Sequence, residues 1–218
     1  MKFVAESFSW PFKGDWKSRW LPGLIAVVLI PIGFIPLLGY AIAATRAAET
    51  NPTEGPPSWA PSVRLLTDGF WTSLVIALLT APFALALNPL ATFLFANHIG
   101  HVTDQAQSQL YAHVVAIFIL ALPWGLLLLL LMPHATARFA HTGNPAHFID
   151  FPAAIRGVRN DFATWNLAAA AIVTGWALGL AAVGLLCIGL VPGVFYAILV
   201  SAHASAALHD KGANSRPR

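Results

Sequence analysis

No lysine or arginine occurs between Arg64 and Arg138, and this stretch is largely apolar. Two runs within it, Gly69 to Leu87 and Leu110 to Met132, each have about the 20 residues that a helix needs to cross roughly 30 Å of hydrocarbon. The stretch therefore predicts two membrane-spanning helices.

The composition extends this class to the whole chain. Of 218 residues, 57% are hydrophobic and 10% are charged, whereas about 25% of a typical soluble domain is charged. Two further runs, about Phe162 to Leu186 and Val191 to Leu208, predict two more spans. The net charge is +3, but the basic residues form no run with interleaved aromatics, so we expect no nucleic-acid partner.

The segment from Leu21 to Ala48 is ambiguous because it is long for one helix and contains Pro22, Pro31 and Pro36. A proline removes a backbone donor and clashes with the preceding turn of a helix. The residues from Pro31 to Pro36 therefore predict a helix break. This break is either a kink in one span or the tip of a helical hairpin.

The basic residues favour the hairpin, because short cytoplasmic loops are enriched in Lys and Arg. A hairpin places the N-terminus, the Ala47 to Leu66 loop, the Pro133 to Asp161 loop and the C-terminal tail on one side. A single span would place Arg138, Arg156 and Arg159 on the opposite side from the N-terminal basic residues. With the hairpin, all the basic residues are cytoplasmic: Lys2, Lys13, Lys17, Arg19, Arg46, Arg64, Arg138, Arg156, Arg159, Lys211, Arg216 and Arg218.

The two ends of the chain resemble each other, since residues 20–42 align with residues 176–198 without a gap. The least common matches are Trp20 with Trp176, Gly33 with Gly189, Pro36 with Pro192 and Tyr40 with Tyr196. The pattern predicts one helix-break-helix unit used twice, with Gly33, Pro36, Gly189 and Pro192 as structural hinges. The alternative is chance similarity between apolar segments.

The expected fold is all-α, a polytopic transmembrane helical bundle with about six membrane-embedded helices and a repeated helical hairpin at each end. Residues 1–20 are predicted to form an interfacial N-terminal segment, residues 21–208 a single transmembrane domain, and residues 209–218 a cytoplasmic polar tail. Within the cytoplasmic loop from Pro133 to Asp161, the residues from Phe151 onward predict an amphipathic helix, with Arg156 and Arg159 facing anionic lipid.

Ionisable side chains inside spans usually mark proton relays, ion paths or catalysis, and the cores of the predicted spans contain none. The chain has no phosphate-binding glycine loop, Gly-x-Ser-x-Gly elbow or His-Glu-x-x-His pattern. We therefore expect no enzymatic activity, no catalytic residues and no cofactor.

The best polar cluster lies in a loop predicted to face outside. His98, His101 and Asp104 are spaced three residues apart, and imidazoles with a carboxylate can bind zinc or another transition metal. The alternative is that these residues face headgroups and water without binding a metal.

Several short motifs occur in a characteristic order: Phe12-Lys13 with Asp15-Trp16, Ile30-Pro31-Ile32-Gly33, Gly39-Tyr40, Pro57-x-Trp59 and Asp68-Gly69. This order resembles the prokaryotic membrane-protein family known as domain of unknown function 4013. The resemblance is strongest from Phe8 to about Leu87. It implies a multi-pass protein of the cytoplasmic membrane of a bacterium or archaeon, and it implies no activity, substrate or cofactor.

Two functions remain open. A passive conduit or permease for a small solute or lipid is suggested by helices broken at corresponding positions, but it requires a polar-lined passage. A non-enzymatic accessory or organising protein requires only apolar faces and small-residue packing stripes such as Gly175-x-x-x-Gly179. We expect the accessory role, with the lipid bilayer and other membrane proteins as partners.

Overall fold

A computed structural model describes the backbone of residues 2–30, 32–96, 104–184 and 189–208. Side chains are described in these ranges except at positions 83–96, 104–107, 109, 113, 117, 121 and 183. All regular structure in the described ranges is helical, which confirms the all-α class. The chain divides into two compact units, Met1–Ser73 with Leu130–Arg218, and Leu74–Leu129.

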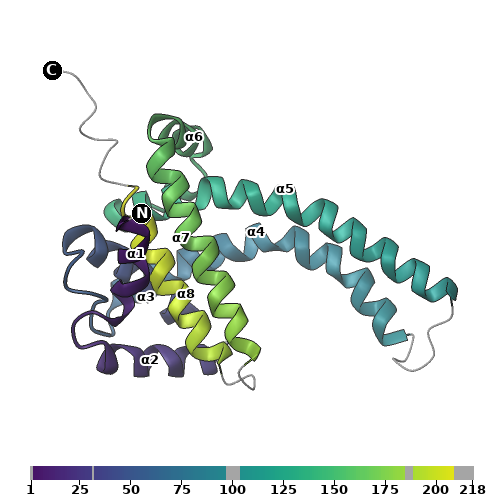
Figure 1. The fold of residues 1–218 in the computed structure, drawn as a ribbon, viewed down its shortest axis with the longest axis horizontal. Helices are drawn as coiled ribbons and strands as arrows, with labels where there is room; N and C mark the ends of the chain where they lie inside the picture. The colour runs from purple at the N-terminus through teal and green to yellow at the C-terminus, as the bar shows by residue number, and fades with distance from the viewer. Residues whose placement is uncertain (1, 31, 97–103, 185–188, 209–218) are drawn as a thin grey trace. The chain divides into compact units, whose positions relative to one another are not determined.

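The helices differ widely in length (Figure 1). Their order is α1 (Lys2–Ser9), η1 (Trp10–Phe12), α2 (Trp16–Val28), α3 (Phe34–Thr50), α4 (Val63–Ala96), α5 (Asp104–Thr142), η2 (Pro145–Phe148), α6 (Phe151–Asn160), α7 (Phe162–Ala181), η3 (Ala182–Gly184) and α8 (Leu190–Ala206). The first unit contains all of these except the parts of α4 and α5 between Leu74 and Leu129.

Among the described residues, three helices are long and apolar enough to cross a membrane: Val63–Pro82, Leu110–Thr142 and Phe162–Ala181. Helix α8 is apolar but shorter. Helix α2 has 13 residues, which at 1.5 Å per residue reach only about 20 Å. Three long candidate spans are therefore present, and the count of six embedded helices stays a prediction.

The predicted helix break between Pro31 and Pro36 is confirmed, because α2 ends at Val28 and α3 begins at Phe34. Helices α3 and α8 each have 17 residues, and each begins directly after a glycine. A Cβ atom on Gly33 would meet the carbonyl oxygen of Ala26, and one on Gly189 would meet that of Ala182. In both places this close approach is possible because the glycine has no side chain.

The two helix pairs differ in how closely they pack. Helices α7 and α8 run side by side, whereas α2 runs in another direction and packs more extensively against α8 than against α3 (Figure 1). Gly175 lies against Val200, and Gly179 against the backbone of Gly193. In the gapless alignment Gly193 corresponds to Leu37, whose side chain would block the same close approach.

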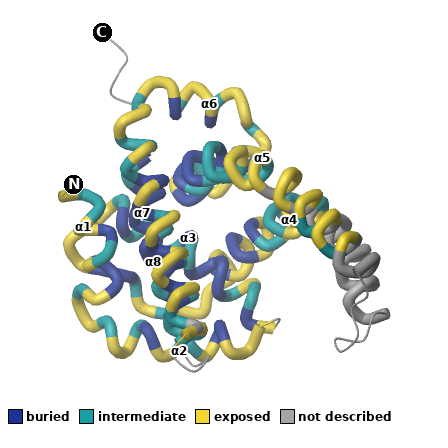
Figure 2. The backbone as a smooth tube through the Cα atoms, turned by 45° about the vertical axis from the view of Figure 1, so that its right-hand side comes forward, coloured by how far each residue is buried: buried dark blue, intermediate teal, exposed yellow. Residues whose placement is uncertain are grey.

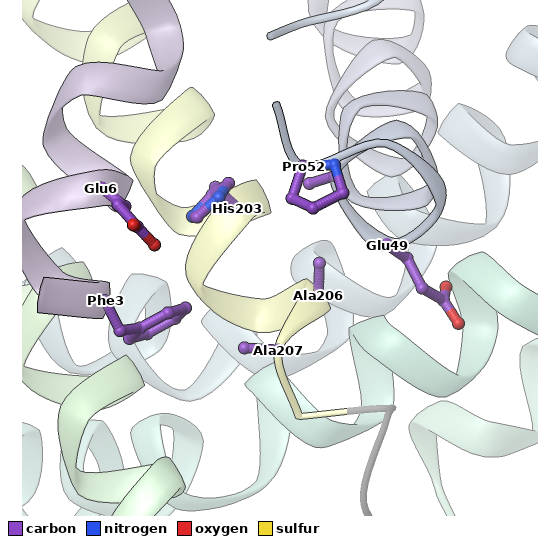
Figure 3. A pocket seen from close by; sticks show the side chains of 8 residues that line it. Phe3, Glu6, Glu49, Pro52, His203, Ala206 and Ala207 are labelled. Carbon is purple, nitrogen blue, oxygen red and sulfur yellow. The ribbon is translucent and has the colours of Figure 1, made fainter. Parts of the chain in front are cut away.

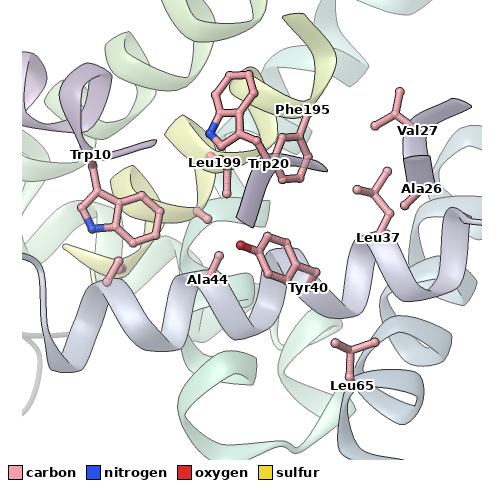
Figure 4. Packing of buried hydrophobic residues seen from close by; sticks show 13 residues of the cluster. Trp10, Trp20, Ala26, Val27, Leu37, Tyr40, Ala44, Leu65, Phe195 and Leu199 are labelled. Carbon is pink, nitrogen blue, oxygen red and sulfur yellow. The ribbon is translucent and has the colours of Figure 1, made fainter. Parts of the chain in front are cut away.

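The main core lies between α2, α3 and α8, with Trp10 from η1 beside them (Figure 4). The buried rings of Tyr40 and Phe195 have centroids 6.0 Å apart, and Trp20 meets Phe195 edge-on at 5.5 Å. Gly23 makes room for Phe195, because a Cβ atom there would overlap its ring. Burial is highest along α3, α8 and the end of α5 (Figure 2).

Helix α5 continues through Pro133 to Thr142, so the prediction that a loop begins at Pro133 is wrong. The residues after Pro133 bury their side chains in the first unit: Ala137 packs with Ala168 and Ala204, and the Phe139 ring lies 4.7 Å from that of Phe148. This burial outweighs the cost of about 3 kcal/mol that a proline imposes inside a helix.

Helix α6 confirms the predicted amphipathic segment. Asp150 caps it by accepting a hydrogen bond from the backbone of Ala153, and a proline stands in its first turn. Its buried residues are Ala154 and Val158, while Arg156 and Arg159 are exposed. One face of α6 therefore packs on the protein and the other is charged.

The second unit consists of the remaining parts of α4 and α5. The indole nitrogen of Trp124 donates a hydrogen bond to the Leu79 carbonyl at 2.9 Å, which joins the two helices. Large apolar side chains of α5 are exposed, among them Phe118, Ile119, Leu122 and Leu126. Such an exposed apolar surface is expected of helices surrounded by lipid.

Candidate functional site

A small cavity of about 190 Å³ opens where the ends of α3 and α8 meet α1 (Figure 3). It is lined by Phe3, Glu6, Ala48, Glu49, Pro52, His203, Ala206 and Ala207. The volume corresponds to about six water molecules and is smaller than most pockets for drug-sized ligands.

His203 is the most deeply buried polar residue of the cavity, with 6% of its surface exposed. Its Nδ1 atom lies 2.9 Å from Ser7 Oγ, within hydrogen-bonding distance. The ring stacks on Phe3 at 5.8 Å and meets Trp10 at 5.2 Å. These contacts fix the N-terminal helix α1 to the end of α8.

A serine hydrogen-bonded to a histidine can act as a nucleophile with its base, but Ser7 is fully buried. Its hydroxyl also donates to the carbonyl of Phe3 at 3.2 Å. The pair therefore forms a buried link between α1 and α8.

The two acidic residues of the cavity do not converge. Glu6 comes from α1, while the Glu49 carboxylate points away from His203 (Figure 3) and lies 3.1 Å from His141 Nδ1. The cavity thus lacks the paired carboxylates of general acid-base sites.

A second polar cluster joins α3, the start of α4 and the end of α5. Arg46 Nη2 lies 3.0 Å from Asp68 Oδ2, and Arg46 Nε donates to the Ala140 carbonyl at 2.8 Å. Arg64 Nε is 4.0 Å from the same carboxylate oxygen. Since only 8% of the Asp68 side chain is exposed, this cluster is a buried link between three helices.

Outside the candidate spans, the pKa values of Asp150 and His147 are shifted by their surroundings. The hydrogen bond from Arg138 lowers the pKa of Asp150. Burial, followed by the charge of Arg138, lowers the pKa of His147. Both shifts favour a charged Asp150 and a neutral His147 near neutral pH.

Changing Ser7 to Ala tests whether the link between α1 and α8 stabilises the fold. The change removes a buried hydrogen bond, and we expect the free energy of unfolding to fall by about 1 to 2 kcal/mol. Unfolding of the purified protein in detergent measures it. Ser18→Ala is the control, because it removes only exposed hydrogen bonds around Asp15; an equal loss in both variants would contradict a structural role for Ser7.

The predicted metal ligands are His98, His101 and Asp104. His98 and His101 lie outside the described residues, and Asp104 begins α5 with its side chain also outside them. Within the part of the chain that the structure describes, no group of three or more His, Cys, Asp or Glu side chains could hold a metal ion.

The predicted hinges lie at the starts of two helices. Gly33 and Gly189 are the N-caps of α3 and α8, and Pro36 and Pro192 follow as the third residues of these helices. A hinge function at these positions stays a prediction.

Sequence reasoning missed the contacts that build the cavity. Ser7 and His203 are 196 residues apart, and neither belongs to a recognisable motif. The ion pair of Arg46 with Asp68 could have been predicted, because charged residues next to long apolar helices usually need a partner of opposite charge.

A family model described as "Protein of unknown function (DUF4013)" matches residues 23–188. The matched region runs from within α2 to beyond η3. Comparisons with curated proteins and with solved structures found no match.

Proposed function

The chain belongs to the DUF4013 family of proteins of unknown function, and we propose that it serves as a non-enzymatic accessory or organising component of the membrane. The observation that carries this proposal is the packing between the first helix pair and α8. Apolar and aromatic side chains fill this contact, including Val27, Leu37, Phe195 and Leu199 (Figure 4).

A conduit between the first helix pair and α8 would need a passage lined by polar groups. Two polar atoms near the contact bind backbone carbonyls: Trp20 Nε1 donates to Pro11 at 2.9 Å, and Tyr40 Oη donates to Pro57 at 2.8 Å. The cavity around His203 lies beside α1 at the C-terminal ends of α3 and α8, where its lining residues Ala48 and Ala206 are small apolar members of the core cluster. These features favour the accessory role over the conduit.

We also propose that the α2–α3 and α7–α8 pairs are copies of one unit and that both termini face the cytoplasm. The equal lengths of α3 and α8 and the matching glycine contacts support the repeat. The contacts of Arg46 with Ala140 and of Glu49 with His141 support a common side, since they join two predicted cytoplasmic segments. The proposed location is the cytoplasmic membrane of a bacterium or archaeon.

Solute flux separates the two functions. Vesicles reconstituted with the protein and loaded with glycerol or a small dye are expected to retain them as well as protein-free vesicles do. Vesicles treated with a pore-forming peptide confirm that leakage would be detected.

Flux that depends on the protein, and that disappears in folded Gly33→Leu or Gly189→Leu variants, would overturn the accessory role in favour of the conduit. Crosslinking in the native membrane provides the positive test, because an organising protein is expected to crosslink to other membrane proteins reproducibly. Only uncrosslinked protein would contradict the proposal.

A further inference from the structure

We propose that the α2–α3 hairpin enters only one leaflet of the bilayer, and that the acyl chains of this leaflet cover its exposed apolar side chains. The inference concerns how the chain is inserted and is independent of the proposed accessory role. It rests on where the polar loop after α3 lies along that helix.

The loop between α3 and α4 folds back beside α3 as far as Tyr40. The Tyr40 hydroxyl donates to the Pro57 carbonyl at 2.8 Å. The Tyr40 and Trp59 rings stack with centroids 4.1 Å apart and planes 9° apart. Along the axis of α3, the non-helical residues Pro57 and Trp59 therefore lie at the same height as Tyr40.

The same loop is polar and in contact with basic residues. Residues 51–54 are exposed, and Arg19 Nη1 donates to the Glu54 carbonyl at 3.1 Å. Gly55, at a φ of +82°, packs against the backbone of Lys13. Exposed coil and charged groups do not occur in contact with hydrocarbon, so this part of the structure lies in the headgroup region or in water.

The other end of the hairpin has the opposite character. Its exposed large side chains are all apolar: Leu21, Ile25, Val28, Leu29, Ile30, Ile32 and Ile35. Ile32, beside the turn, is 85% exposed. Lys17 and Arg19 with Trp16 stand where this apolar surface begins, as is typical of a membrane interface.

The distance between these two regions fixes the depth of insertion. Tyr40 lies seven positions after Gly33 in the chain, which corresponds to about 10 Å along the helix. One leaflet contributes about 15 Å of hydrocarbon. The tip of the hairpin therefore ends within the leaflet that it enters.

Spin labelling tests this depth. In a Cys187→Ser background, Ile32→Cys carries a nitroxide label in vesicles of phosphatidylethanolamine and phosphatidylglycerol, and Thr53→Cys in the exposed loop is the matched control. We expect the label at residue 32 to collide with oxygen and be protected from a water-soluble nickel chelate. The label at residue 53 is expected to collide freely with the chelate.

Labelling from each side completes the test. A membrane-impermeant maleimide is expected to modify residue 53 from one side, and residue 32 from neither side of an intact vesicle. Modification of residue 32 from the side opposite residue 53, or a depth beyond the midplane, would show a full crossing and overturn the proposal. Free collision of the residue 32 label with the chelate would also overturn it, because the hairpin would then lie outside the bilayer.

Discussion

Replacing Gly39 or Gly69 with leucine is expected to remove most of the folded protein. These glycines lie where α3 and α4 cross: a Cβ atom on Gly39 would overlap the Leu65 carbonyl oxygen, and one on Gly69 would overlap that of Ile35. Both obstacles are backbone atoms, which cannot turn aside as a side chain can. We expect each change to lower the free energy of unfolding by about 3 kcal/mol or more, a large share of the roughly 5 to 15 kcal/mol typical of a folded protein.

The measurement is unfolding by denaturant, combined with the yield of monodisperse protein in detergent. Gly125→Ala is the matched control, because no atom lies within 4 Å of its added Cβ and alanine favours a helix by about 1 kcal/mol over glycine. Unfolding of the leucine variants at the parental denaturant concentration would contradict the close crossing.

Removing Arg46 is expected to have the second large effect. Arg46→Met would leave the buried Asp68 carboxylate with Arg64 at 4.0 Å and would also remove the hydrogen bond to Ala140. Breaking a buried ion pair from one side usually costs about 3 to 5 kcal/mol. Because Arg64 remains, we expect about 3 kcal/mol, measured by the same unfolding experiment.

Two further variants identify the cause. Arg138→Gln breaks the pair with Asp150, whose side chains are 33% and 36% exposed, and it is expected to be much less harmful. The double variant Arg46→Met with Asp68→Leu should recover stability relative to Arg46→Met alone, because no buried charge is left unpaired. Equal losses in the single and double variants would show that packing, rather than charge, explains the effect.

The sequence predicted the features that depend on local chemistry. The proline-rich segment before Pro36 correctly located the break between α2 and α3, because proline disrupts a helix wherever packing does not compensate. The same reasoning was wrong at Pro133, where α5 continues. There the cost of a proline inside a helix is offset by packing against Phe148 and Ala204, which lie far from Pro133 in the sequence. The aligned pair Gly193 and Leu37 already indicated why the two helix pairs pack differently, because leucine cannot approach a neighbouring helix as closely as glycine can.

The candidate site was beyond prediction because its parts meet only in the folded chain. Nothing near Ser7 indicates that a histidine will lie against it, and Glu49 gives no sign of its contact with His141. Small residues such as Gly39 and Gly69 predict close helix packing in general, but they do not identify the partner helix.

Because Ser7 pairs with His203, α1 can reach its final contacts only after nearly the whole chain has been synthesised. Ribosomes add about 5 to 20 residues per second, so the 196 residues between the two partners take about 10 to 40 s to synthesise. For most of this interval α2 and α3 are already made but lack α8, the helix that buries Trp20, Tyr40 and Ala44 with Phe195 and Leu199. Until α8 is made, the N-terminal helices therefore lack the side chains that bury their core-forming faces in the finished chain.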